Sequence, residues 1–485
     1  MKKLKNEKSS WTICQECKGR GKKSRGLSKK ARDHYQLACD EFKKTKNQGT
    51  APVRPKGHLY SCLNCFGSGL VPCVSPPLAD EKNYPHVAII GAGIGGVALA
   101  VACLQRGIPF SLYERDSNFD TRSQGYGLTL QQASKAIEAL GIVSLKEGVV
   151  STRHLVHTTA GKVIGEWGVR KWMQSGAKTT TKRTNIHIAR QSLRLALLEQ
   201  LGGHDKVQWG HQLMGFKELE GEAIDLSLQV DGEIQHAKAD LVVGADGIRS
   251  SVRSLLIPAN IAPLRYLDCI VILGICPLSA LEGLNSPLLD SATVFQTANG
   301  NERIYIMPYA SDSVMWQLSF PMSEEEAKTL SVQGPKALKE EACRRTQWHD
   351  PIPSILAVTQ EAQVSGYPVY DRELLKSELL EKGGPVTLIG DAAHPMSPFK
   401  GQGANQALID ALELARSIKR GCRPSSQWKE AGVRTSVLTE FEAEMLERSA
   451  SKVKDSADAA ELLHSELVLH EGDEPRGRLI KKKDI

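Results

Sequence analysis

The sequence lacks any apolar segment long enough to cross a membrane. The apolar runs that stand out, such as 87–90 and 241–243, have only the length of a strand and soon meet glycine or charge. The first ten residues are basic and contain neither the apolar stretch nor the small-residue cleavage site of a secretory leader. Hydrophobic residues make up 41% of the 485 residues, as in ordinary globular proteins. We therefore expect a cytoplasmic protein of two or three domains without a membrane span.

The excess of positive over negative charge is confined to one end of the chain. Residues 1–60 hold seventeen Lys and Arg against five Asp and Glu, whereas the whole chain has a net charge of only +7. The remainder is therefore mildly acidic. A basic end beside such a body is typical of a solvated arm or of a surface for an acidic partner. It is a candidate site for a protein partner, and nucleic-acid binding is not favoured.

The cysteines are concentrated at the same end. Six of the eleven lie before residue 74, and the other five are scattered singly. This asymmetry indicates a metal site rather than a secreted disulfide framework. The six are Cys14, Cys17, Cys39, Cys62, Cys65 and Cys73.

Four of these cysteines belong to a repeated motif, CxxCxGxG, at residues 14–21 and 62–69. Two residues between the thiols allow one tight turn to present both sulfurs to a single ion, and the glycines permit the positive φ angles of such a turn. Four thiolates suit zinc best and leave no open position for catalysis. The zinc ligands that we expect are Cys14, Cys17, Cys62 and Cys65.

The repeat resembles the cysteine-rich repeats of J-domain co-chaperones. Those proteins carry four copies and two metals, so two copies imply one zinc site, and the resemblance does not imply chaperone activity. Between the two halves, residues 28–44 are expected to form a helix that closes the module. His34, Cys39 and Cys73 are candidate spare ligands. Thiols that act as a redox switch, or that have no function, are the alternatives to zinc.

A glycine-rich turn follows the first apolar strand. The strand at 85–90 runs into Gly91-Ala92-Gly93-Ile94-Gly95-Gly96, and a helix over 97–106 follows. The first glycine of this motif is expected to turn sharply, the second to let the backbone approach a pyrophosphate, and the last to allow close helix packing. A second strand at 110–113 ends in Glu114, where an acid can bind the ribose hydroxyls of adenosine. The pattern predicts a dinucleotide site, with a plain strand-to-helix turn as the alternative.

Two motifs further along the chain distinguish FAD from a nicotinamide dehydrogenase. Residues 240–253 read DLVVGADGIRSSVR, in which a buried strand opens into an acidic glycine turn. Residues 386–395 read VTLIGDAAHP, followed by Pro398 and by GQGANQA at 401–407. In order and spacing, the three motifs resemble those of class A FAD-dependent monooxygenases. This aromatic hydroxylase superfamily includes salicylate hydroxylases, urate hydroxylases, zeaxanthin epoxidases and tetracycline-inactivating monooxygenases.

The resemblance implies an α/β fold. A Rossmann-like, glutathione-reductase-like FAD-binding domain is interleaved with a mixed β-sheet substrate domain, and the small N-terminal zinc-binding module is added to it. The expected division is a module at 1–75, a monooxygenase at 85–450 and a helical tail at 451–485. The FAD-binding segments are about 85–150, 186–262 and 381–420, and the substrate sheet is about 150–185 and 262–380.

The motifs also suggest which residues hold FAD. Asp391 ends a strand, so its carboxylate can accept hydrogen bonds from the ribityl hydroxyls, with a buried structural aspartate as the alternative. The helix after Gly403 is expected to point its N-terminus at the pyrimidine edge of the flavin. The resemblance implies that Arg190 and Arg122 reach FAD, that Arg115 lies by the adenosine, and that Asp246 serves both FAD and the nicotinamide. The expected cofactor-binding residues are Gly91, Gly93, Ile94, Gly95, Gly96, Glu114, Arg115, Arg122, Arg190, Asp246, Gly247, Gly390, Asp391, Pro398, Gly401, Gly403, Ala404 and Asn405.

The resemblance implies a monooxygenase activity. NAD(P)H would reduce FAD, and dioxygen would form a flavin hydroperoxide that hydroxylates or epoxidises a small, aromatic or unsaturated substrate. Such chemistry requires exclusion of water and no Ser, Cys or His nucleophile. His394 is therefore expected to belong to its turn, and no catalytic residue is assigned. Candidate pocket walls, for which plain core is the alternative, are Tyr305, Met307, Trp316 and Leu318.

Two other functions compete with this one. A flavin-dependent halogenase is disfavoured because its Trp-x-Trp-x-Ile-Pro signature is absent, and residues 347–353, QWHDPIP, do not match it. The other alternative is a flavin-stabilised partner-binding protein, with the zinc module as its interaction site. Intact FAD motifs argue against it.

Overall fold

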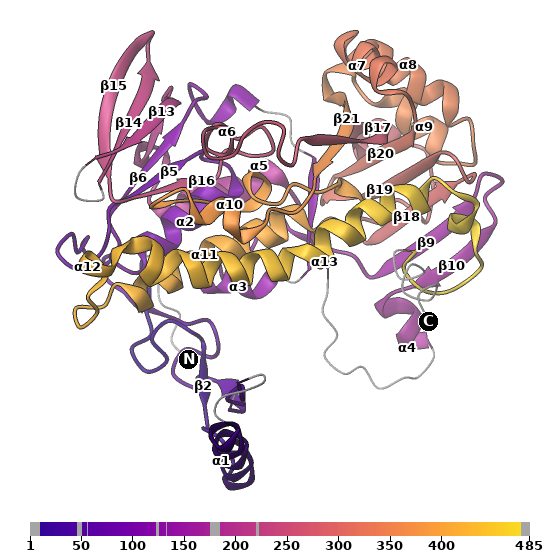
Figure 1. The fold of residues 1–485 in the computed structure, drawn as a ribbon. Helices are drawn as coiled ribbons and strands as arrows, with labels where there is room; N and C mark the ends of the chain where they lie inside the picture. Colours follow the sequence, from indigo (N-terminus) through magenta and orange to yellow (C-terminus); the bar gives the residue numbers. More distant parts are fainter. Residues whose placement is uncertain are drawn as a thin grey trace.

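Two β-sheets form the body of the protein. The computed structural model describes residues 10–45, 51–55, 57–122, 126–131, 133–174, 185–219 and 223–476. Figure 1 shows one sheet on the left with α2 and α11, the other on the right with α7, α8 and α9, and the long helix α13 running from the left part to the right part. Together they form the expected α/β fold with a parallel and a mixed sheet.

The first sheet has five parallel strands. They are drawn from three separate parts of the chain, and the three glycine turns of the sequence follow the adjacent strands β5, β16 and β22. Every residue of these three strands is buried, as is typical of a parallel sheet with both faces covered. The order is β12 (Val207–Trp209), β6 (Phe110–Glu114), β5 (Val87–Ile90), β16 (Leu241–Gly244) and β22 (Val386–Leu388).

Three helices pack around this sheet in the order that the motifs predict. The glycine turn leads into α2 (Ile94–Leu104), which contacts α5 (Arg190–Leu201) and α11 (Gly403–Gly421). Most of α2 is buried because its residues are small or apolar. The close packing of these helices brings the glycine turn, the start of α5 and the start of α11 together.

The second sheet has seven strands and is mixed. The pair β9 and β18 is parallel, and the other pairs are antiparallel. One face packs against α7 (Glu324–Val332), α8 (Pro335–Arg345) and α9 (Ile352–Val358). The order is β10 (Val163–Trp167), β9 (Arg153–Thr158), β18 (Thr293–Ala298), β19 (Arg303–Ala310), β20 (Ser313–Pro321), β17 (Leu264–Pro277) and β21 (Val364–Arg372).

Smaller elements connect these layers. One three-stranded sheet contains β7 (Gly127–Leu130), β11 (Ile186–Ala189) and β8 (Val149–Val150), and a second one contains β13 (Gln212–Glu218), β14 (Ile224–Val230) and β15 (Glu233–Ala239). The remaining α-helices of the body are α3 (Ser134–Ala139), α4 (Val169–Gln174), α6 (Ser251–Leu256), α10 (Ser377–Glu381), α12 (Trp428–Val433) and α13 (Thr439–Leu463).

The C-terminal helix differs from its prediction. A helical tail was expected over 451–485, but the helix α13 begins at Thr439 and ends at Leu463. A short turn, Glu466–Leu469, follows. The helix packs against α10 and α11.

The N-terminal module consists of two strand–turn–strand halves, joined to each other by two short strand pairs, and one helix. Strand β1 (Ser10–Ile13) pairs with β4 (Leu70–Cys73), and β2 (Lys22–Ser24) pairs with β3 (Leu59–Ser61). The predicted helix is present as α1 (Lys29–Lys44), with Ser28 as its N-cap, but it has no buried residue. It protrudes from the module at the bottom of Figure 1. Within the described ranges, none of the helices has the length and apolar character that a membrane span requires.

Candidate functional site

The three glycines of the first turn have different surroundings. Gly91 has a φ of +101°, and a Cβ atom there would lie 2.7 Å from the carbonyl oxygen of Ala245. A Cβ atom at Gly96 would lie 1.9 Å from the carbonyl oxygen of Gly91. At Gly93 the nearest atom would be Nη2 of Arg190, at 3.9 Å. Two glycines thus allow close packing, while the middle one leaves the space that a phosphate needs.

Glu114 and Arg194 hold this turn from either side. Oε2 of Glu114 accepts a hydrogen bond from the backbone N–H of Ala92 at 2.8 Å, and Nε of Arg194 donates to the carbonyl of the same residue at 2.7 Å. Arg115, which follows Glu114, is exposed. Arg194 was missed in the sequence, although it lies one helical turn after Arg190.

The second acidic turn caps a helix. The carboxylate of Asp246 accepts hydrogen bonds from Oγ of Ser250 at 2.5 Å and from the N–H of Ser251 at 2.7 Å, at the start of α6. Burial raises the pKa of Asp246 despite these bonds. Gly247 has a φ of +82° and no described atom within 4 Å of its Cβ position, so the turn is open on that side. Asp246 thus stabilises the turn that packs against Gly91.

The third turn places a carboxylate on the wall of a cavity. Asp391 follows β22, and its exposed side chain lines the cavity. Desolvation by the surrounding protein raises its pKa, and the charges of His394 and Arg190 only partly oppose the effect. Arg190 therefore faces both the glycine turn and Asp391. Its guanidinium also lies 5.8 Å from the ring centroid of Tyr126.

A buried network supports the Asp391 turn. The carboxylate of Asp410 accepts hydrogen bonds from the N–H of Gly390 at 2.9 Å and from Arg448 at 2.9 Å, and it pairs with Nε2 of His394 at 2.7 Å. Burial favours neutral side chains, but the mutual attraction raises the pKa of His394 and lowers that of Asp410. His394 is 1% exposed, so it is a structural part of the turn, as expected.

Helix α11 begins at the same cavity. Gly401 has a φ of +58°, and α11 starts at Gly403 without a side-chain cap on its first amides. Gly401, Gly403 and Ala404 line the cavity together with Pro398. Asn405 instead points into the protein, where Oδ1 accepts a hydrogen bond from the N–H of Gln131 at 2.9 Å. The open helix end provides partial positive charge at the cavity wall.

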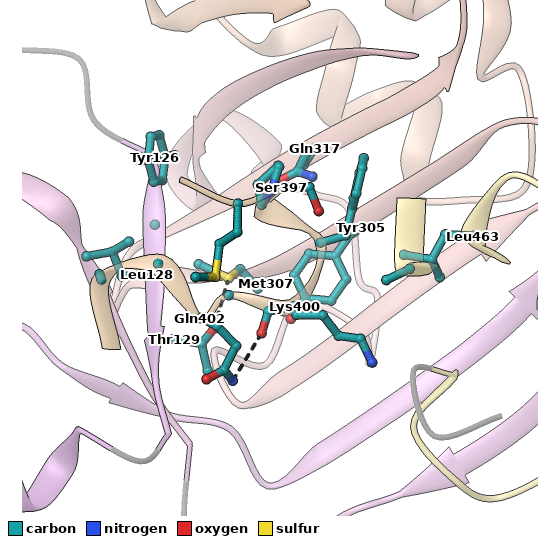
Figure 2. A pocket seen from close by; sticks show the side chains of 18 of the residues that line it. Tyr126, Leu128, Thr129, Tyr305, Met307, Gln317, Ser397, Lys400, Gln402 and Leu463 are labelled. Atoms are coloured by element: carbon teal, nitrogen blue, oxygen red, sulfur yellow. Dashed lines mark hydrogen bonds between the residues drawn. The ribbon is translucent and has the colours of Figure 1, made fainter. Parts of the chain in front are cut away.

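The cavity has a volume of about 860 Å³ and lies between this helix end and the mixed sheet. Figure 2 shows Tyr126, Leu128 and Thr129 on one side of it, Tyr305 and Leu463 towards the other, and the sulfur of Met307 between them. Helix α13 contributes to the wall through Lys452, Asp455, Ala459 and Leu463. This role of the C-terminal helix was not visible in the sequence.

Two of the four candidate pocket walls are correct. Tyr305 and Met307 line the cavity, whereas Trp316 and Leu318 are fully buried in the core against the outer helices. The prediction failed at β20 because alternate residues of a strand face opposite sides, and here Met315 and Gln317 face the cavity. Both faces of β20 are covered, so its sequence shows no polar face that would reveal the register.

The predicted residues therefore separate into groups. The glycine turn at 91–96, Arg190, Asp391 and the start of α11 converge around one edge of the parallel sheet. Asp246 and Glu114 support that edge and do not line the cavity, although Ile248 and Arg249 of the second turn do. Arg122 ends a short turn, Phe119–Arg122, and its side chain lies outside the described residues. Space at Gly93, an enclosed carboxylate and an open helix end suit a dinucleotide that carries phosphates, hydroxyls and an electron-poor ring.

A second candidate site lies in the N-terminal module. Cys14, Cys17, Cys62 and Cys65 are buried, and their Sγ atoms all lie within 4.8 Å of one another. The N–H of Gly21 donates to Sγ of Cys17 at 3.2 Å, and that of Gly69 donates to Sγ of Cys65 at 3.3 Å.

Two equivalent backbone hydrogen bonds also join the two halves of the module. The N–H of Cys14 donates to the carbonyl of Gly69, and the N–H of Cys62 donates to the carbonyl of Gly21, both at 2.8 Å. Among the described residues, the suggested spare ligands His34, Cys39 and Cys73 are not part of the metal-binding group. The arrangement fits one tetrahedral ion held by four thiolates.

Comparisons with known proteins agree with the geometry of the cavity. The family model described as "FAD binding domain" matches residues 84–424. Aurachin C monooxygenase/isomerase of Stigmatella aurantiaca is 29% identical over 343 residues, which cover 70% of this chain and 81% of that protein. The FAD-dependent monooxygenase thnD of Trichoderma harzianum is 26% identical over 387 residues, covering 76% and 91%.

Solved structures share the fold. HpxO of Klebsiella pneumoniae, complexed with FAD and uric acid, superposes with a TM-score of 0.65 at 20% identity, covering 82% of this chain and 95% of that one. PqsL of Pseudomonas aeruginosa gives a TM-score of 0.62 at 24% identity, covering 83% and 100%. These comparisons give no support to a halogenase. Since the family model spans most of its length, the chain belongs to the FAD binding domain family and is an FAD-dependent monooxygenase.

Proposed function

We propose that this monooxygenase uses NAD(P)H and dioxygen to hydroxylate or epoxidise a small, aromatic or unsaturated organic molecule. Bound FAD supplies the redox chemistry, namely electron uptake from the nicotinamide and activation of dioxygen. The observation that carries the proposal is the cavity of about 860 Å³, which joins the Asp391 turn to the mixed sheet. Its volume lies within the range of small-molecule sites.

Each converging group has a role in this proposal. Gly93 would admit the pyrophosphate of FAD to the N-terminus of α2, with Arg190 beside it. The carboxylate of Asp391 would accept hydrogen bonds from the ribityl hydroxyls. The open amides of α11 at Gly403 and Ala404 would hold the pyrimidine edge and stabilise the negative charge of the reduced ring.

The mixed sheet excludes water from the reacting atoms. Tyr305, Met307 and Gln317 form its cavity-facing surface, and helix α13 closes one side with Leu463. A site from which water is excluded favours transfer of oxygen to the substrate over loss of the oxidising equivalents to water.

For the N-terminal module we propose one structural zinc ion and a role in binding a protein partner. A centre of four thiolates has no open coordination position, so it serves structure rather than catalysis. Helix α1 has no buried residue and carries basic side chains, which leaves a surface for an acidic partner. The proposed division is a zinc module at 1–75, the enzyme at 85–450 and the tail at 451–485.

The proposal is tested by reducing the purified protein. We expect a yellow protein with one FAD per chain that NADH or NADPH bleaches without oxygen, and bleaching should accelerate when the substrate is present. Comparison of the two nicotinamides identifies the donor. In air, product mass measured against hydrogen peroxide formation separates oxygenation from uncoupled oxidation. FAD that resists reduction by both donors would instead favour the partner-binding function.

A further inference from the structure

The cavity face of the mixed sheet changes in character along β19. Arg303, Tyr305 and Met307 alternate along this strand and all line the cavity. A Cβ atom at Gly127 of β7 would lie 2.2 Å from Cε of Met307, so Met307 packs against that strand. Arg303 lies four residues away, about 13 Å along the strand.

Neighbouring strands repeat the change. Met307 pairs with Met315, Tyr305 pairs with Gln317 and Gln296, and Arg303 pairs with Ser319. The cavity face of the mixed sheet therefore changes from apolar, sulfur-containing side chains at one end, through amide and phenol groups, to a guanidinium at the other end. A ligand that matches this surface is apolar at one end and anionic at the other.

Arg303 is a buried cation without a carboxylate. Its side chain is 5% exposed, its Nε donates to Oε1 of Gln296 at 2.7 Å, and its guanidinium lies 5.0 Å from the ring centroid of Tyr305. Within the described part of the chain, its two Nη atoms form no hydrogen bond and no acid pairs with it. Burial lowers its pKa to about 10, so it stays charged at neutral pH. A buried, unpaired charge is costly unless a ligand neutralises it.

Other charges on the cavity wall favour the same kind of ligand. The basic side chains outnumber the acidic ones, which are Asp391 and Asp455. Beside Arg303, burial raises the pKa of Tyr305 to about 12, so its hydroxyl remains a donor for an anionic oxygen. The basic side chains that line the cavity are Arg249, Arg303, Lys400, Lys452 and Arg476.

We infer that Arg303 binds the carboxylate of the substrate, and that the substrates are small organic acids whose apolar part lies beneath Met307. The inference rests on the proposed monooxygenase function, which places the flavin near Asp391 and α11. A guanidinium presents two parallel N–H donors that match the two oxygens of a carboxylate. Tyr305 and Gln317 lie between the two ends and can hold the body of the molecule.

The test uses the FAD-loaded enzyme and pairs of ligands that differ mainly in charge. Benzoate, cinnamate and 2-naphthoate are each compared with their primary amides, and binding is followed by the change in flavin absorption. We expect at least one acid to bind at least about ten-fold more tightly than its amide, since hydrogen bonds to charged groups contribute about 1.5–3 kcal/mol. Arg303→Gln should weaken the binding of that acid by ~10- to 100-fold and leave the binding of its amide nearly unchanged.

Three variants make the result specific. Arg303→Lys keeps the charge but loses the paired donors, so it should fall between wild type and Arg303→Gln. Arg303→Met preserves the aliphatic stem and replaces Arg303→Gln if that variant does not fold. Arg344→Gln removes an exposed arginine of α8 and should keep the wild-type preference.

The outcomes are distinct. If no acid binds wild type more tightly than its amide, or if Arg303→Gln keeps the preference, the inference is overturned. FAD content and reduction by NAD(P)H are measured on the same preparations. Loss of these properties in wild type would refute the proposed function itself, whereas a reducible flavin without acid preference would refute only the role of Arg303.

Discussion

Gly93 and Gly96 stand three residues apart in one motif, yet a methyl group should act differently at each. In Gly96→Ala the new Cβ would lie 1.9 Å from the carbonyl oxygen of Gly91, whereas carbon and oxygen normally approach to about 3.3 Å. The neighbouring backbone must move by more than about 1 Å. Since α2 is buried on nearly all sides, little relaxation is available.

The expected costs follow from these distances. Overpacking costs about 1–3 kcal/mol, here at the upper end, and the better helix propensity of alanine returns up to about 1 kcal/mol. We therefore expect Gly96→Ala to lose about 2 kcal/mol of stability without FAD. Gly93 has φ −72° and ψ −173°, which alanine adopts freely, so Gly93→Ala should lose no more than about 1 kcal/mol, the value of a helix cap.

For FAD binding, in contrast to stability, the substitution at Gly93 should be the more harmful of the two. A methyl group at Gly93 fills the space proposed for the pyrophosphate, so FAD affinity should fall at least ~10-fold. Urea unfolding of the FAD-free proteins measures stability, and quenching of FAD fluorescence measures binding. Gly215→Ala is the control, because no described atom lies within 4 Å of its Cβ position. Wild-type FAD affinity in Gly93→Ala, or equal stability of the two motif variants, would refute the reasoning.

Two further predictions concern buried ionisable groups and the metal. Burial raises the pKa of Asp391 above its unfolded value near 3.9, so the ionised form destabilises the FAD-free fold at neutral pH. Asp391→Asn should therefore unfold at a higher urea concentration than wild type at pH 8. This gain in stability should vanish below about pH 4, where Asp391 is protonated in both the folded and the unfolded state. The variant should also bind FAD less tightly, and an equal gain in stability at both pH values would contradict the prediction. Elemental analysis should find one zinc per chain, lost in Cys14→Ser and retained in Cys39→Ser. Trp11 lies in β1, just before Cys14, and packs against Gly141 of the body. Loss of the metal should therefore also change the fluorescence of Trp11. A wild-type protein that contains no zinc, and whose fluorescence does not change when zinc is added, would rule the site out.

Local signals predicted where the three glycine turns lie. Each glycine turn is specified by a few consecutive residues, and the order strand, turn, helix is visible in the sequence around Gly91 and Asp391. The CxxCxGxG repeat likewise predicted the four clustered thiols, because two residues between cysteines impose one turn. Helix α1 was located for the same reason, since its N-cap and its composition are local.

Long-range contacts decided which side chains support these turns. His394 could be assigned to its turn from the motif, but its buried partner Asp410 and the cation Arg448 come from two later helices. Arg194 of α5 supports the glycine turn by a hydrogen bond to the carbonyl of Ala92, although only Arg190 was expected there. Neither pairing has a sequence signature, because each depends on which helix faces lie against each other.

By itself, the sequence determined the fold class, the family, the position of the glycine turns and the cysteine cluster, because backbone turns, strand ends and thiol pairs are encoded at short spacing. Only the tertiary structure decided which side chains meet the substrate. The mixed sheet is covered on both faces, so hydrophobicity does not distinguish Tyr305, which faces the cavity, from Trp316, which faces the core. Arg303 lies in the cavity wall as a buried cation because of the register of β18, β19 and β20. Helix α13 encloses the same cavity from another side.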